Sequence, residues 1–236
     1  MRELYVKLYE TALANLSFLI PVKGARYDAQ SNLRFMLVGR ATNGWDVKGE
    51  NLCDRDYPDK HKFADGAVEI LEKEGSFHER FPNLETYWRT SAFWQYSKEV
   101  YERLSGKKEN DWYENIVWYN LYPIAPQIEG NPSEGFRKGM AGISAELLEE
   151  YIRKFNPTHI LFATGWDWFK DIFINLIRAN SELFSGILVE QSKGSLVDAK
   201  GICEGRKVVV AKHPERKRKE DYINQTLNAF TSIVSG

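Results

Sequence analysis

Four short polar segments in this sequence each follow an apolar run, and their residue types suit the binding of a planar, polar ligand. They are residues 39–45, 120–123, 164–166 and 212–214. The first and third contain glycine, which lets backbone N–H groups approach a ligand closely. The second contains an asparagine, whose amide offers both a donor and an acceptor to the edge of a base. The fourth contains a histidine, which can donate to an oxygen on which negative charge develops.

The first segment, Gly-Arg-Ala-Thr-Asn-Gly-Trp, carries polar side chains between two glycines. Arg40, Thr42 and Asn43 can donate to an anion or to the edge of a base. The alternative is a plain turn from a strand into a loop, in which Asn43 adopts a left-handed conformation. The segment is not a Walker loop, because no Gly-Lys-Ser/Thr follows it, and it lacks the third glycine of the dinucleotide fingerprint.

Asn120 and His213 each stand at the end of an apolar run. Asn120 can read a base edge, or it can simply cap a turn before Pro123. The proline after His213 favours an extended conformation there, and the histidine is either a donor to a substrate oxygen or a surface residue in a turn. The basic run 215–219 follows directly. It is either solvated surface or a contact to phosphates beside the site.

The elements that position these segments follow from the periodicity of apolar residues. Strands are predicted at 33–38, 115–119, 158–163 and 206–211, and helices at 3–19, 64–74, 85–105, 143–155, 166–180 and 220–234; residues 184–202 can add a short edge strand. Strands that alternate with helices predict a three-layer α/β/α sandwich with a central, mainly parallel four-stranded sheet. Right-handed crossovers then bring all four strand carboxyl ends to one edge, where open α/β sheets bind ligands. We expect one domain over 1–236, with 1–32 as a helical extension packed on it.

Composition excludes several other classes of protein. The net charge of −1 gives no overall attraction to nucleic acid. Two cysteines, Cys53 and Cys203, are too few for a disulfide scaffold or for an all-cysteine zinc or iron–sulfur site in one chain. The 7 Trp, 12 Tyr and 13 Phe residues indicate a bulky core or an aromatic pocket. No signal peptide and no membrane-spanning stretch are apparent, so we expect a soluble, cytoplasmic protein.

In this order and spacing, the four segments resemble the uracil-DNA glycosylase superfamily. In that family the first strand of a parallel α/β/α sandwich ends in a Gly-led motif, the second in an asparagine that reads the flipped base, and the fourth in a His-Pro motif. The counterparts here are GRATNG at 39–44, Asn120 in VWYNLYP, and His213-Pro214. TGWDWF, after the third strand, is similar to the family's Gly-led helix start. The resemblance extends over residues 33–235.

The resemblance implies a DNA base-excision glycosylase that hydrolyses the N-glycosidic bond of uracil, or of a related base, once the base is out of the stack. His213 would stabilise charge on O2 of the leaving base, and Asn43, or else Asp46, would position water. The implied base-binding residues are Gly39, Arg40, Ala41, Thr42, Trp45, Phe63 and Asn120. Gly165, Arg216, Lys217 and Arg218 would contact the DNA backbone. We expect DNA as the partner of a monomer, with no metal or other cofactor.

Departures from the family pattern leave two other hypotheses open. The acid that the family places one or two residues beyond the glycine is replaced by Arg40 or Ala41, and Asn43 lies two positions later than the asparagine of other branches. Charged residues 215–218 stand where the family has an apolar wedge. The second hypothesis is therefore a catalytically silent nucleic-acid or nucleotide-binding protein on the same fold. The third is an unrelated α/β enzyme that acts on a nucleotide-like ligand.

Overall fold

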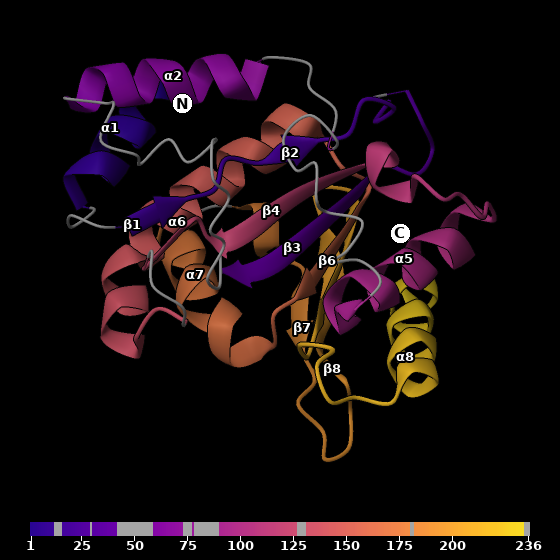
Figure 1. The fold of residues 1–236 in the computed structure, drawn as a ribbon. Helices are drawn as coiled ribbons and strands as arrows, with labels where there is room; N and C mark the ends of the chain where they lie inside the picture. Colours follow the sequence, from indigo (N-terminus) through magenta and orange to yellow (C-terminus); the bar gives the residue numbers. More distant parts are fainter. Residues whose placement is uncertain are drawn as a thin grey trace.

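A computed structural model of the 236-residue chain describes residues 1–11, 16–28, 30–41, 59–72, 77, 90–126, 131–179 and 182–233. Their centre is a seven-stranded sheet in the order β2-β4-β3-β6-β9-β8-β7 (Figure 1). Its strands are β2 (Val22–Lys23), β3 (Phe35–Ala41), β4 (Ile116–Tyr122), β6 (His159–Ala163), β7 (Ile187–Val189), β8 (Val197–Cys203) and β9 (Arg206–Ala211). A separate antiparallel pair joins β1 (Leu16–Phe18) to β5 (Ile124–Pro126).

The sheet is parallel in its middle and antiparallel at its edges. Strands β4, β3, β6 and β9 pair in parallel, whereas β2, β8 and β7 are antiparallel to their neighbours. The α/β class is therefore confirmed, but the prediction of a four-stranded sheet is wrong. Strand β8 lacks the continuous apolar run of a parallel strand buried on both faces, because it reads VDAKGIC and is only partly buried.

Helices cover both faces of the sheet (Figure 1). The helices are α1 (Arg2–Thr11), α2 (Lys60–Glu72), α5 (Ala92–Ser105), α6 (Glu134–Phe155), α7 (Trp166–Arg178) and α8 (Lys219–Ser232), with short 3-10 turns η1 (Trp112–Asn115) and η2 (Glu182–Phe184). Helices α1, α2, α6 and α7 share one core with the sheet, and α5 and α8 share the other. Within these described residues, none of the helices combines the length and apolar character needed to cross a membrane.

The two cores follow from the alternation of side chains along the strands. In β3, Met36 and Val38 join the core under α6 and α7, while Phe35 and Leu37 join the core under α5 and α8. All four side chains are fully buried. Because successive strand residues point to opposite faces, a central strand covered by helices on both sides must be apolar at every position. This requirement explains why the four parallel strands are visible in the sequence.

The N-terminal region differs from the predicted helix over residues 3–19. Helix α1 ends at Thr11, and residues 16–18 form β1, which pairs with β5. The backbone N–H of Leu19 also donates to the carbonyl of Pro123 at 2.8 Å. The leucine spacing is compatible with a helix, but pairing with a distant segment decides the conformation, and such pairing is invisible to local periodicity. The N-terminal extension, residues 1–32, is thus part helix and part strand, and its strand β2 joins the main sheet.

Helix α6 has 22 residues and starts well before the predicted range 143–155. Ser133 caps its start, and the Ser133 hydroxyl accepts a hydrogen bond from the Phe136 N–H at 3.2 Å. It ends at Asn156, which adopts a left-handed conformation with φ of 45°. Three glycines, at 135, 139 and 142, weaken the helical signal of the first half. The cap and the core contacts of its later turns compensate for that weak propensity.

Candidate functional site

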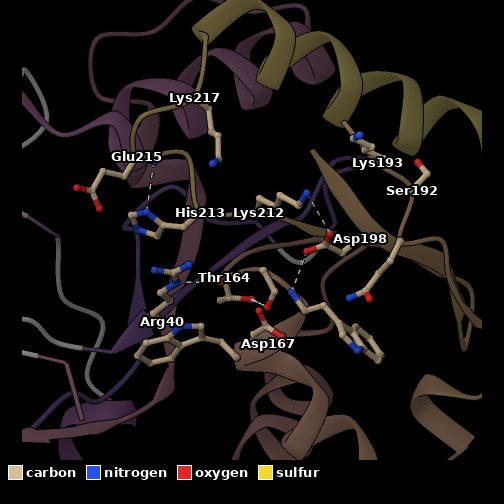
Figure 2. Close-up of a pocket in the computed structure, with 14 residues that line it drawn as sticks. Arg40, Thr164, Asp167, Ser192, Lys193, Asp198, Lys212, His213, Glu215 and Lys217 are labelled. Carbon is tan, nitrogen blue, oxygen red and sulfur yellow. Dashed lines mark hydrogen bonds and ion pairs between the residues drawn. The ribbon is translucent and has the colours of Figure 1, made fainter. Parts of the chain in front are cut away.

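The carboxyl ends of the parallel strands bring the predicted segments together. Strands β3, β6 and β9 end at Ala41, Ala163 and Ala211, and the last two are direct partners in the ladder. Beyond these ends lies a cavity of about 560 Å³ (Figure 2). Of the predicted site residues, Arg40, Gly165, His213 and Lys217 line it. Lys193 and Asp198 also line it, and neither was predicted.

Next to this cavity, Gly39, Asn120, Phe93 and His213 form a continuous chain of neighbours. Gly39 and Asn120 are partners across the β3–β4 ladder, and Asn120 lies inside β4 rather than at its end. A Cβ atom on Gly39 would lie 2.4 Å from Asn120 Oδ1 and 3.3 Å from Phe93 Cζ. The Phe93 ring is stacked on the His213 imidazole, with centroids 6.2 Å apart and an interplanar angle of 15°. Residues from two strands, a helix and a loop therefore meet at one place.

The Asn120 side chain is buried at this place. The residue is 3% exposed, although asparagine is usually found at the surface. Among the residues that the structure describes, no hydrogen bond reaches its amide group. Asn120 does not line the cavity itself. An amide in this position can pair with a donor and an acceptor of a ligand without first breaking a described hydrogen bond.

His213 is held as a neutral imidazole. Its Nδ1 accepts a hydrogen bond from the backbone N–H of Glu215 at 3.3 Å, which places the ring proton on Nε2. Burial, and secondly the nearby positive charge of Arg40, lower the pKa of His213 to about 4. Above about pH 5 the side chain is therefore an uncharged donor through Nε2. Such a donor can stabilise negative charge on a ligand oxygen without itself carrying a charge into the cavity.

Two partly buried histidines, His159 and His213, should make the protein less stable in mild acid. The pKa of His159 is also lowered to about 4, by burial first and by Lys207 second. Unfolded histidines take up protons below about pH 6.5, whereas His159 and His213 resist protonation in the fold until about pH 4. The free energy of unfolding should thus fall across this interval, by about 1–2 kcal/mol for each histidine after allowance for partial exposure. Urea unfolding measured at a series of pH values checks this.

The matched variant for this measurement is the double substitution of His159 and His213 by asparagine. Carboxylates that form ion pairs also lose stabilisation in acid, and they are the same in both proteins. The double variant should therefore show a shallower decline between about pH 6.5 and pH 4.5. Equal declines in the two proteins would mean that the histidines do not contribute.

Arg40 crosses from β3 to the start of α7. Its Nε donates to the carbonyl of Thr164 at 2.9 Å, and its guanidinium carbon lies 5.2 Å from the ring centroid of Trp168. Arg137, from the first turn of α6, lies over the same ring at 4.3 Å. Partial burial is the main reason why the pKa of Arg40 is lowered. The aromatic contact and the hydrogen bond fix this cation at the cavity wall.

Asp198 is a cavity carboxylate that the sequence prediction missed, because the sequence indicated only a short edge strand at an undefined place within residues 184–202, and β8 spans Val197–Cys203. It is 5% exposed, and its Oδ2 accepts a hydrogen bond from the backbone N–H of Trp166, the first residue of α7, at 2.9 Å. Its Oδ1 lies 3.9 Å from the Lys212 ammonium group (Figure 2). Asp198 therefore ties β8 to the start of α7 and to the end of β9. It also places negative charge in the cavity, on a strand other than β3.

The other predicted residues are distributed as follows. Phe63 is 2% exposed, and its ring packs between Tyr5 and Tyr9 in the α1–α2 core, so the structure does not bring it to the cavity. The reason is that Phe63 belongs to the apolar stripe of α2, not to a loop. The side chains of Arg216 and Arg218 are 90% and 88% exposed and pair with Glu215 and Asp221. Ala41 ends β3. Thr42, Asn43, Trp45 and Asp46 lie outside the described residues.

No cluster of three or more histidine, cysteine, aspartate or glutamate side chains suited to a metal ion occurs in the described ranges. Phe93, which the prediction also missed, is the second residue of α5, and no local pattern marks which helical aromatic residue faces a site.

A scan against models of known protein families and a search of curated proteins both give no match.

Proposed function

We propose that this protein binds a nucleobase at the carboxyl edge of its sheet and hydrolyses the N-glycosidic bond of uracil or a related base in DNA. The observation that carries the proposal is the contact between Gly39, Asn120, Phe93 and His213 beside the cavity. It combines a buried amide without described partners and a neutral histidine donor. The amide is needed to recognise the edge of a base, and the histidine donor is needed to stabilise the base as a leaving group.

Each of these residues has a defined task in the proposed reaction. The Asn120 amide would pair with the donor and acceptor on the base edge. His213 Nε2–H would donate to the base oxygen that gains negative charge as the glycosidic bond breaks. Gly39 is required because any side chain there would collide with Asn120 Oδ1. The base must leave the duplex stack to reach this depth.

A second candidate function is binding of a nucleotide or nucleic acid without hydrolysis. A specific observation favours it: Arg40 and Ala41 end β3, where a water-activating carboxylate would be expected. Asp198 does place a carboxylate at the cavity, but this group already accepts the Trp166 N–H and lies near Lys212. An ion pair of this kind favours a supporting role over that of a free base.

An excision assay decides between the two functions. Single- and double-stranded oligonucleotides that contain uracil, a thymine mismatch or hypoxanthine are incubated with the protein, and abasic sites are detected by alkaline cleavage. We expect product from at least one substrate with wild-type protein and none with Asn120→Ala. Absence of product from all substrates, together with salt-dependent binding, would reject hydrolysis and support the second function. Absence of both product and binding would reject the two functions together.

A further inference from the structure

Two positively charged side chains flank His213 and have no carboxylate partner in the described part of the chain. Arg40 reaches the cavity from β3, and Lys217 reaches it from the loop that follows β9. Both act electrostatically on the His213 ring. Figure 2 shows Lys217 extending toward the cavity on one side of His213 and Arg40 on the other. Neither forms an ion pair within 4.0 Å among residues whose placement is described.

The acids around the cavity are engaged with other cations. Glu215 lies 3.7 Å from Arg216, and Asp167, which is 89% exposed, lies 3.8 Å from Lys170. Asp198 faces Lys212 and accepts the first N–H of α7. With His213 neutral, Arg40 and Lys217 thus have no carboxylate within 4.0 Å among the described residues, and Glu215 and Asp167 act on Arg40 only from a longer distance. Lys193, another cavity residue without a described ion pair, adds to the positive potential from the β7–β8 connection.

The fixed geometry of Arg40 makes it a suitable anion receptor. Its Nε is occupied by the Thr164 carbonyl, so the guanidinium is oriented while its two terminal amino groups remain available. Burial lowers the pKa of Arg40, and the charges of Glu215 and Asp167 counter that effect only in part. A bound anion would offset more of the cost of burial. A guanidinium and an ammonium group that face a shared space match the several acceptor oxygens of a phosphate group.

We propose that the cavity binds the phosphate group of a nucleotide or a nucleic-acid strand between Arg40 and Lys217, next to His213. The inference deepens the proposed function and rests on it for the identity of the base, because Asn120, which would read the base, does not line the cavity. It assigns Arg40 to phosphate rather than to the base. It also assigns Lys217, but not its exposed neighbours Arg216 and Arg218, to direct contact.

Isothermal titration calorimetry at constant ionic strength tests this assignment. The probes are inorganic phosphate, deoxyuridine, thymidine and deoxyinosine, the monophosphates of these nucleosides, and a short single-stranded oligonucleotide. We expect that each nucleoside monophosphate that binds does so at least about tenfold more tightly than its nucleoside. Arg40→Gln and Lys217→Gln should each remove most of that difference, and they should weaken inorganic phosphate to a similar extent. Their affinity for the nucleosides should not change.

The matched control is Arg216→Gln, which makes the same charge change one residue away, on a side chain that is 90% exposed. It should leave phosphate binding within about twofold of wild type. Equal losses in Arg216→Gln and Lys217→Gln, or equal affinity for nucleoside and monophosphate, would overturn the proposal. Lys217→Gln is a loop substitution, and circular dichroism confirms the fold of each variant.

The probes also distinguish a free nucleotide from a nucleic-acid strand as the source of the phosphate. In addition, they test the proposed base binding and the proposed phosphate binding separately. Tight binding of monophosphates identifies a free nucleotide as the ligand, and binding of the oligonucleotide alone identifies a strand backbone. Either result supports the assignment if it depends on Arg40 and Lys217. If phosphate binds while nucleosides do not bind and no base is excised, the base proposal fails and the phosphate site stands. If nucleosides bind and a phosphate group adds no affinity, the phosphate proposal fails and the base proposal stands.

Discussion

Replacement of Gly39 by alanine is expected to abolish base binding and excision while the chain still folds. The new Cβ would lie 2.4 Å from Asn120 Oδ1 and 3.3 Å from the Phe93 ring, so the amide must turn away from its present position. Overpacking at a site where only a side-chain end has to move costs about 1–3 kcal/mol. Nucleoside binding by calorimetry, the excision assay and urea unfolding together measure both effects.

The chain offers two matched controls for this substitution. Gly139→Ala introduces the same methyl group on α6, where a Cβ would have no neighbour within 4 Å, and it should leave binding unchanged and stability equal or slightly higher. The double variant Gly39→Ala, Asn120→Ala removes the colliding atom. It should recover most of the stability that the single variant loses, but no base binding. Wild-type binding in Gly39→Ala would show that the Asn120 amide does not contact the ligand.

Substitution of His213 by alanine should lower the excision rate by about 10²–10³-fold with little change in nucleoside affinity. The reason is that a neutral donor aimed at a developing negative charge acts in the transition state more than in the ground state. His213→Asn keeps an amide donor and should retain more activity than His213→Ala. Because the pKa of His213 is lowered to about 4, its protonation should leave the wild-type rate flat above about pH 5.

His61→Ala is the control for the histidine series, because His61 lies exposed on α2, away from the cavity lining. It should match wild type in rate and affinity. Single-turnover kinetics separate the chemical step from binding and product release. A fall in the His213→Ala rate that comes entirely from weaker substrate binding would contradict the assignment of a leaving-group donor.

The sequence predicts those parts of the fold in which local pattern and burial agree. The four parallel strands are buried on both faces, so their apolar runs identify them directly. Strand β8 is held by antiparallel pairing with β9 and contains Asp198, Lys200 and Gly201, so no run marks it. Strand β1 depends on β5, more than one hundred residues away. Pairings between distant segments are set by tertiary structure, which local propensity does not encode.

The same distinction holds for the candidate site. Arg40, Gly165 and His213 reach the cavity because they end parallel strands or follow them within two residues, and Lys217 lies in the loop after β9. Strand order alone places these segments at one edge. Phe93 and Asp198 arrive from a helix and from an antiparallel strand. Phe63 was expected at the cavity but lies in the α1–α2 core, since its region is helical and not a loop. The roles predicted for residues 42–46, which include Asn43, stay predictions because these residues lie outside the described ranges.

The origin of the cavity wall has a consequence for how this protein can diversify. The floor is formed by ends of parallel strands that also carry both cores, so changes there endanger folding. The opposite wall contains Ser192 and Lys193, from the connection between β7 and β8 at the outer side of the sheet. Connections of this kind tolerate insertions and substitutions well. Ligand preference can therefore change through the β7–β8 connection while the floor made by the strand ends is preserved.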